Sequence, residues 1–432
     1  MKIIYQVLFI GFFSLCFLIS KEQTIIKTKG SADPSIDYKN LSNIDTLING
    51  YIQRGWVNGV VTLVIKDGNV IRNKGYGYSD LAEKKIMQPD NIFRIASQTK
   101  AIVSTGILIL YDEGKISLSD PVSKYIPGFA NAKVLDKFNA ADTTYTTVPA
   151  KRNITIKDLL THSSGIDYPG IGTDQMKAIY AKENIPSGLG VVNQNLVETM
   201  NKLGTLLLSF QPGTQWRYGL SVDVLGAVIE VVSGMSLEDF LRKNILTPLN
   251  MNDTWFNLPA NKADRLTSVY TEDSLHQIVL WNKELSHIDP TYPLINKHYF
   301  SGGAGLSSTA MDYAIFLQMI MNGGSYNGKR ILSKRIVEMV LHNQLNFPFN
   351  GINYFGLGFE IVSDKGSADQ PRNEGSFDWG GFFGTTYWAD PKEHLIVLFM
   401  TQQTPNSHGE LEQKFEQIFI CQPKIIEDLF NK

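Results

Sequence analysis

The stretch Phe93–Leu110, which reads FRIASQTKAIVSTGILIL, decides the organisation of this chain. Its apolar second half, AIVSTGILIL, is followed by Tyr-Asp-Glu and then by Gly114. A continuous apolar run that closes on a glycine predicts a buried helix, because glycine readily adopts the left-handed conformation that ends helices. Ser97 then lies at or near the helix start, and Lys100 stands about one turn further along the same face.

This spacing puts an amine beside a hydroxyl, which is the pairing that nucleophilic catalysis needs. A serine hydroxyl is a poor nucleophile unless a neighbouring group takes its proton. A lysine amine can take it when neutral, and burial in apolar surroundings favours the neutral form. Free N–H groups at the helix start add stabilisation for a developing oxyanion. Ser-x-x-Lys also arises by chance in a long chain, with Ser97 as a helix cap and Lys100 on the surface, so further motifs must decide.

Four further motifs follow in the rest of the chain. They read LTHSSG from Leu160, PGTQWRYGLSVDVLG from Pro212, GGAGLSSTAMDY from Gly302 and WGGFFGT from Trp379. With Ser-x-x-Lys, these motifs resemble the serine beta-lactamase-like superfamily, which contains class C beta-lactamases, penicillin-binding DD-peptidases and related family VIII-type esterases. The resemblance runs from about residue 44 to residue 402, in the order of the family.

Strand patterns occur at both ends of the chain and helical patterns lie between them. Strands are expected at 60–65, 69–72, 356–362, 384–389 and 394–400, the first two joined by a tight Asp67-Gly68 turn. Helices are expected around 47–52 and at 99–113, 155–162, 191–203, 221–234, 236–245, 309–322, 333–342 and 408–420, with irregular stretches at 128–153 and 259–301. This order predicts an α+β fold, in which an antiparallel sheet flanked by helices lies beside a mostly helical lobe. The resemblance implies the same beta-lactamase/transpeptidase-like fold.

The chain divides into three parts by composition. Residues 1–20 have a short basic start and an apolar centre, which predicts a secretory signal peptide, and residues 21–40 are expected to form a linker. The hydrolase domain is expected over 41–420, with a sheet region at about 41–95 and 350–420 and a helical region at about 96–349. We therefore expect an exported protein, periplasmic or associated with the cell envelope. An uncleaved membrane anchor, or a lipid on Cys16, is the alternative for the N-terminal segment.

Composition excludes several classes of function. Hydrophobic residues make up 43% of the 432 residues, which suffices for a large core. Lys plus Arg number 40 against 42 Asp plus Glu, so no nucleic-acid partner is expected, and any membrane tether would be the N-terminal segment. Cys16 and Cys421 are the two cysteines and build no disulfide framework. The seven histidines lack metal-ligand spacing, so we expect no metal and no cofactor.

The resemblance implies roles for three side chains. Ser97 corresponds to the acylated nucleophile, Lys100 to its proton partner, and Tyr218 to the phenol that helps to pass protons to the leaving group. Leu220 replaces the Asn of the usual Tyr-x-Asn, which normally contacts a substrate amide, so an amide or lactam substrate is less favoured. Just beyond, Ser221 and Asp223 resemble a helix start that holds Tyr218 in place, and simple helix capping is the preferred interpretation of both.

The third family motif departs most from the penicillin-binding pattern. Trp379, Gly380 and Gly381 stand where those proteins carry Lys-Thr-Gly, and they supply no cation for a substrate carboxylate. A Trp-x-Gly at this place is similar to the esterases of the superfamily. The backbone N–H groups of Ser97 and Phe382 are then the expected oxyanion hole. Five aromatic residues are candidates for an apolar pocket, with core packing as the alternative for each: Trp216, Trp379, Phe382, Phe383 and Tyr387.

His162 is expected to be a buried structural residue and not part of a Ser-His pair. The chain contains no Gly-x-Ser-x-Gly elbow, which argues against an alpha/beta-hydrolase triad. These observations predict an exported serine hydrolase that forms an acyl-enzyme on Ser97 and acts on small-molecule esters. A beta-lactamase or DD-peptidase acting on peptide-like cell-wall substrates is the first alternative, and a non-catalytic binding protein is the second. The natural substrate and the oligomeric state stay open.

Overall fold

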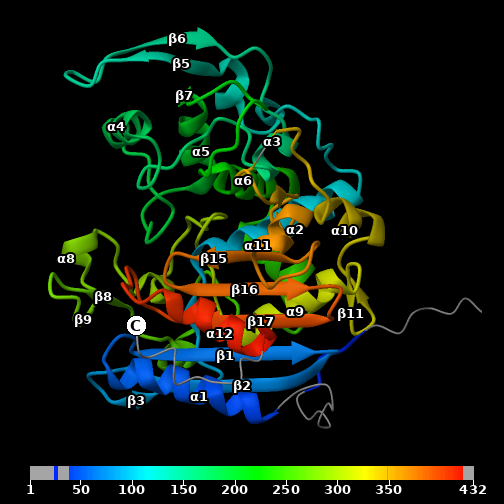
Figure 1. The fold of residues 1–432 in the computed structure, drawn as a ribbon. Coiled ribbons are helices and arrows are strands. Elements are labelled where there is room, and N and C mark those ends of the chain that lie inside the picture. Colours follow the sequence, from blue (N-terminus) through cyan, green and yellow to red (C-terminus); the bar gives the residue numbers. More distant parts are fainter. Residues whose placement is uncertain (1–23, 28–37, 348, 422–432) are drawn as a thin grey trace, which may run out of the picture.

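Both ends of the chain contribute to one antiparallel sheet of eight strands, which fills the lower half of the molecule in Figure 1. The structure is a computed structural model and describes residues 24–27, 38–347 and 349–421. The strand order is β13-β14-β15-β16-β17-β1-β2-β3. The bounds are β1 (Gly59–Lys66), β2 (Asn69–Asp80), β3 (Lys85–Ile86), β13 (Tyr354–Phe355), β14 (Glu360–Ile361), β15 (Phe377–Gly381), β16 (Thr385–Asp390) and β17 (Leu395–Met400).

The centre of the sheet joins the first strand to the last, with Leu63 of β1 opposite Leu398 of β17. Side chains alternate between the two faces, so Val64 contacts α1 (Tyr38–Gln53) and α12 (Glu410–Cys421), while Leu63 and Leu398 face the helical lobe. Both faces are therefore covered, which explains why β17 reads as an uninterrupted apolar run.

The helical lobe lies above the sheet in Figure 1, and α2 (Thr99–Asp112) runs between the two parts. Buried side chains of α2 contact those of α6 in one continuous core. The other helices are α3 (Ile156–Leu160), α4 (Asp174–Lys182), α5 (Leu196–Gly204), α6 (Ser221–Ser233), α7 (Leu237–Leu241), α8 (Lys283–Ser286), α9 (Ala310–Met321), α10 (Lys334–Val340) and α11 (Asp364–Asp369). The short strands are β4 (Phe93–Arg94), β5 (Lys133–Phe138), β6 (Tyr145–Pro149), β7 (Leu207–Leu208), β8 (Tyr270–Glu272), β9 (Ile278–Leu280), β10 (Ser307–Ser308), β11 (Ser325–Tyr326) and β12 (Lys329–Arg330).

The predicted fold class is confirmed, but several local expectations were wrong. The stretch 128–153, expected to be irregular, contains the β5–β6 hairpin, whose mostly exposed residues lack an apolar pattern. The stretch 259–301 contains β8, β9 and α8. The strand expected at 356–362 shrinks to β14, because Gly358 has φ +98° and interrupts it.

The segment before α1 is in part attached to the body of the protein. Lys27 donates its N–H to Gly68 O (2.7 Å) and accepts from Val70 N (3.1 Å), so residues 24–27 lie against the β1–β2 turn. The linker expected at 21–40 therefore includes a docked piece, and α1 already begins at Tyr38. The expected signal peptide lies outside the described residues. Within the described ranges, no helix has the length and apolar character needed to cross a membrane.

Candidate active site

Ser97 lies in a strained turn at the start of α2. Ala96 has φ +41°, a left-handed conformation that residues with a Cβ seldom adopt. From α9, Tyr313 donates a hydrogen bond to Gln98 O (2.9 Å). Helix α9 thus fixes the turn that contains Ser97. As the sequence predicted, Ser97 lies at the start of the buried helix.

Lys100 is buried, with 3% of its surface exposed, and points back along the helix toward Ser97. Its Nζ lies 3.3 Å from Ser97 Oγ and 2.7 Å from the carbonyl oxygen of Gly303. The same atom lies 4.4 Å from the ring centroid of Tyr218. The hydroxyl, the amine and the phenol ring predicted from distant motifs therefore meet at one place.

Tyr218 is fixed by aromatic neighbours and by one hydrogen bond. Its ring stacks on Tyr168 with centroids 5.7 Å apart, and its hydroxyl accepts the indole N–H of Trp379 at 3.4 Å. Two loops and one strand of the sheet therefore converge on this phenol. The indole N–H is therefore directed at the oxygen for which the sequence predicts a proton-transfer role.

Strand β15 brings the third motif to the Ser97 turn. Trp379, Gly380 and Gly381 pair with β16, and the strand packs against the turn that holds Ser97. A Cβ on Gly381 would lie 2.5 Å from Ile95 O, so only glycine lets the sheet edge come this close.

The five aromatic residues predicted to line a pocket separate into two groups. Phe383 and Tyr387 are buried in the core. Trp216 and Trp379 are partly exposed and both contact the ring of Phe355. Phe382, just beyond β15, is 43% exposed and meets Trp281 edge-on at 6.2 Å. Trp216, Trp379 and Phe382 are thus available to an apolar ligand, whereas the other two are structural.

His162 is buried among rings and carries no charge. Burial, together with the nearby Lys100, lowers the pKa of His162 to about 3. The rings of Trp216 and Tyr218 lie 5.8 and 5.0 Å away, and Arg217 donates its N–H to the carbonyl oxygen of His162 (2.9 Å). These contacts join the His162 loop to the Tyr218 loop, in line with the expected structural role. Among the described residues, no three His, Cys, Asp or Glu side chains lie where they could hold a metal ion.

The family is settled by comparison with known proteins. The model of the family described as Beta-lactamase matches residues 44–418. The chain belongs to the beta-lactamase family. The chain is similar to Esterase EstB of Burkholderia gladioli, with 26% identity over 392 residues that cover 87% of this chain and 94% of EstB. A putative D-alanyl-D-alanine carboxypeptidase of Escherichia coli K12 is 24% identical, covering 94% of this chain and 91% of the relative.

A solved structure shows that the fold is shared as well. EstCE1, described as a hydrolase with promiscuous acyltransferase activity, superposes with a TM-score of 0.72 at 24% identity and covers 88% of this chain and 99% of its own. Together with the family match, these likenesses make the protein a serine hydrolase of the acyl-enzyme type. The recognition made from the five motifs is confirmed.

Sequence reasoning missed a second layer of this beta-lactamase-family site. Tyr168 stacks on Tyr218, and Gly303 offers its carbonyl oxygen to Lys100. Asp223 was expected to cap α6, which is wrong, because the helix has no side-chain cap and the carboxylate points instead to Ser301 Oγ at 2.7 Å. Only the glycine-rich run at 302–305 hinted at a close backbone approach.

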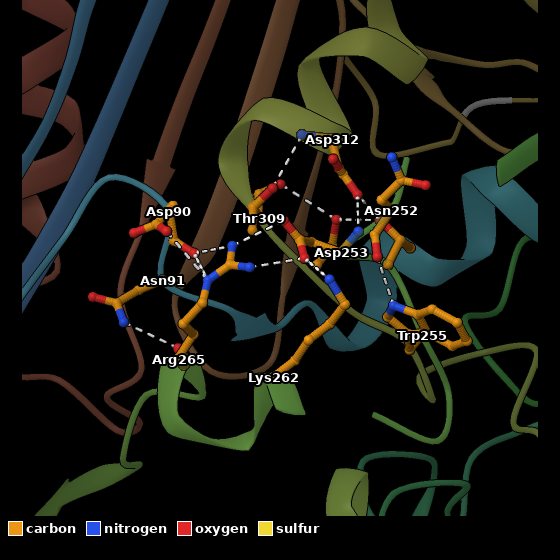
Figure 2. A network of polar contacts seen from close by, with 11 residues as sticks. Asp90, Asn91, Asn252, Asp253, Trp255, Lys262, Arg265, Thr309 and Asp312 are labelled. Carbon is orange, nitrogen blue, oxygen red and sulfur yellow. Dashed lines mark hydrogen bonds and ion pairs between the residues drawn. The ribbon is translucent and has the colours of Figure 1, made fainter. Parts of the chain in front are cut away.

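A polar network braces the loop at 252–255 against α9, as Figure 2 shows. Arg265 and Lys262 both direct their cationic groups at Asp253, with Arg265 making two hydrogen bonds to the carboxylate. Asp312 of α9 accepts from the backbone N–H of Asp253 (2.8 Å) and from Thr254 Oγ1 (2.9 Å). The braced loop then pairs with β10, which pairs with β4 just before Ser97.

Proposed function

We propose that this protein is an exported carboxylesterase-type hydrolase, in which Ser97 is acylated and Lys100 and Tyr218 share the proton transfers. In this mechanism Ser97 Oγ gives its proton to Lys100 and bonds to the ester carbonyl carbon. The tetrahedral intermediate then expels the alkoxide, which receives a proton by way of Tyr218. Water repeats the sequence to release the acid. The serine hydrolase class is established by the family, and the ester substrate and these roles are our inference.

One observation carries the ester preference. The place of the third motif holds Trp379, whose N–H is bonded to the phenol oxygen of Tyr218, and two glycines. This triplet offers no cation that would attract the free carboxylate of a penicillin or of a D-alanyl peptide. Partly exposed rings lie next to it instead, and they suit apolar acyl or alcohol groups. The N–H groups of Ser97 and Phe382 are the proposed oxyanion donors.

Export is proposed from the sequence of residues 1–20, whose basic start and apolar centre are typical of a secretory signal. Fractionation of cells that produce the full chain would test this. We expect activity in the periplasm or envelope and a protein shortened at its N-terminus, whereas full-length protein in the cytoplasm would contradict export.

A paired substrate test separates the esterase from its first rival. We expect turnover of p-nitrophenyl acetate and butyrate, loss of that turnover in Ser97→Ala, and little or no hydrolysis of nitrocefin. Fast lactam turnover without ester cleavage would favour the beta-lactamase or DD-peptidase alternative, to which the carboxypeptidase relative lends some weight.

A non-catalytic binding protein is the second rival, and a covalent probe tests it. A fluorophosphonate should add its mass to the wild-type protein and not to Ser97→Ala. Absence of an adduct on the wild type, or an adduct that survives this substitution, would favour the binding role.

A further inference from the structure

Asp223 is a buried carboxylate that the proposed mechanism does not yet use. It lies in the first turn of α6 and has no exposed surface. Its Oδ1 accepts hydrogen bonds from Ser301 Oγ (2.7 Å) and from the hydroxyl of Tyr299 (3.5 Å). Its Oδ2 makes no hydrogen bond of good geometry among the described residues, although the backbone N–H of Gly303 faces this carboxylate. Because buried carboxylate oxygens are normally well satisfied, this incompletely bonded oxygen needs an explanation.

This oxygen of Asp223 points to the glycine that also binds Lys100. A Cβ placed on Gly303 would collide with Asp223 Oδ2 and would lie 3.4 Å from Lys100 Nζ. The carbonyl oxygen of Gly303 meanwhile accepts from that Nζ at 2.7 Å. The carboxylate and the amine therefore flank one residue without a side chain, with nothing but its backbone between them.

The surroundings make Asp223 the natural counter-charge of Lys100. The other groups facing Lys100 are neutral, namely Ser97, Tyr218, the Tyr168 ring at 5.5 Å and the uncharged His162. Around Asp223 lie Tyr299, Ser301 and Tyr168. Burial raises the pKa of Asp223, and the bond from Ser301 and the attraction of Lys100 oppose that rise. Asp223 and Lys100 therefore attract each other, although the backbone of Gly303 lies between them.

We propose that Asp223 is a positioning residue that stabilises the ammonium of Lys100 while it holds the proton taken from Ser97. This inference rests on the proposed function. In that step the Oγ–H bond of Ser97 breaks, an Nζ–H bond forms on Lys100, and Oγ bonds to the carbonyl carbon. A new buried ammonium is costly unless an opposite charge lies near it, and Asp223 supplies that charge without accepting the proton itself.

The test compares Asp223→Asn with wild type over pH 4 to 9 on p-nitrophenyl acetate. Asn keeps the shape and removes the charge. Without the counter-charge the ammonium is less stable, so the amine becomes free at lower pH. We expect the acidic limb of the kcat profile to move down by roughly one pH unit. The plateau of kcat should fall by about tenfold, and KM should change little.

Asp167→Asn is the matched control, because Asp167 is equally buried in the helical lobe but binds Thr173 and the backbone of its own loop. In Asp167→Asn the acidic limb of the kcat profile should lie at the wild-type pH, even if this variant unfolds at a lower temperature. If Asp223→Asn does not fold, Asp223→Ser removes the charge with a smaller side chain, and the same downward shift of the acidic limb is expected.

Two outcomes separate this inference from the proposed function. If folded Asp223 variants keep the wild-type limb while wild type hydrolyses the ester through Ser97, the positioning role is overturned and the esterase stands. If wild type neither turns over esters nor is labelled at Ser97, the proposed function fails, and the inference fails with it.

Discussion

Lys100 is the residue whose replacement tests the proton transfer most directly. Its Nζ lies 3.3 Å from Ser97 Oγ, and Lys100→Ala removes the proposed proton acceptor of that hydroxyl. We expect kcat on p-nitrophenyl acetate to fall by at least about a hundredfold, as is typical when general-base help is lost. Steady-state kinetics on a variant with an unchanged circular dichroism spectrum would measure this. Wild-type turnover in the variant would mean that another base serves Ser97.

A substitution of Trp379 tests the hydrogen bond from its indole N–H to the hydroxyl of Tyr218. Trp379→Phe keeps a ring beside Tyr218 and removes the N–H that reaches its hydroxyl at 3.4 Å. A neutral hydrogen bond contributes about 0.5–1.5 kcal/mol, so kcat should fall by roughly two- to tenfold. Trp216→Phe is the comparison, because the N–H of Trp216 has no partner among the described residues, and kcat should stay closer to wild type. Equal effects of both substitutions would show that ring packing alone matters.

Among single residues, the sequence predicted the site residues that belong to motifs. It missed those whose partners come close only when the chain folds. Ser97, Lys100 and Tyr218 carry recognisable spacings, and the structure brings them together. Asp223 resembled a capping residue because its partner, Ser301, lies far along the chain. A contact of that kind leaves no local pattern.

Among the structural elements, the brace formed by α9 and the loop at 252–254 should make stability depend on pH. Burial raises the pKa of Asp312 from 3.8 to about 6. The favourable contribution of its protonated form is fully present below pH 3.8 and is lost as the pH rises through about 6, at a cost of about 3 kcal/mol.

Asp312→Asn, which cannot ionise, should therefore gain stability relative to wild type as the pH rises from about 4 to 7, with little further change above that. Thermal unfolding of both proteins across that range measures the effect. Parallel curves would contradict it. Asp253→Asn should instead be less stable than wild type at neutral pH, and the difference should shrink only as the pH falls below about 4. Burial tends to raise the pKa of Asp253, but Arg265 and Lys262 hold it below its usual value, so its charge stabilises the fold.

Elements with a strong apolar pattern were predictable, and polar ones were not. Helix α2 and strand β17 match their expected ranges within a residue. The β5–β6 hairpin was missed because both its faces are largely solvated, so no alternation marks it. Helix α4 was missed too, although Thr173 caps it.

For the whole molecule, the seam between β1 and β17 should dominate stability. Leu398 is fully buried opposite Leu63, and Leu398→Ala removes its side chain from the core. We expect the free energy of unfolding in urea to fall by about 2–5 kcal/mol. Leu275→Ala is the control, because Leu275 is 74% exposed and its loss should stay within about 0.5 kcal/mol. Similar losses in both variants would contradict a sheet closed by this seam.

The architecture as a whole was predictable because strands at both ends, with helices between them, leave few ways to bury every apolar face. The arrangement of loops around the Ser97 turn was not, since it depends on backbone approaches such as that of Gly381 to Ile95.

The pairing of Leu63 with Leu398 also sets the timing of folding during synthesis. The ribosome delivers β1 before the helical lobe, yet it delivers the neighbouring strand β17 only after that lobe. Until then the nascent hairpin keeps an open, apolar edge that invites wrong partners. Such long-range closure is slow, so we expect this edge to be the part of the chain most prone to aggregation while the protein folds.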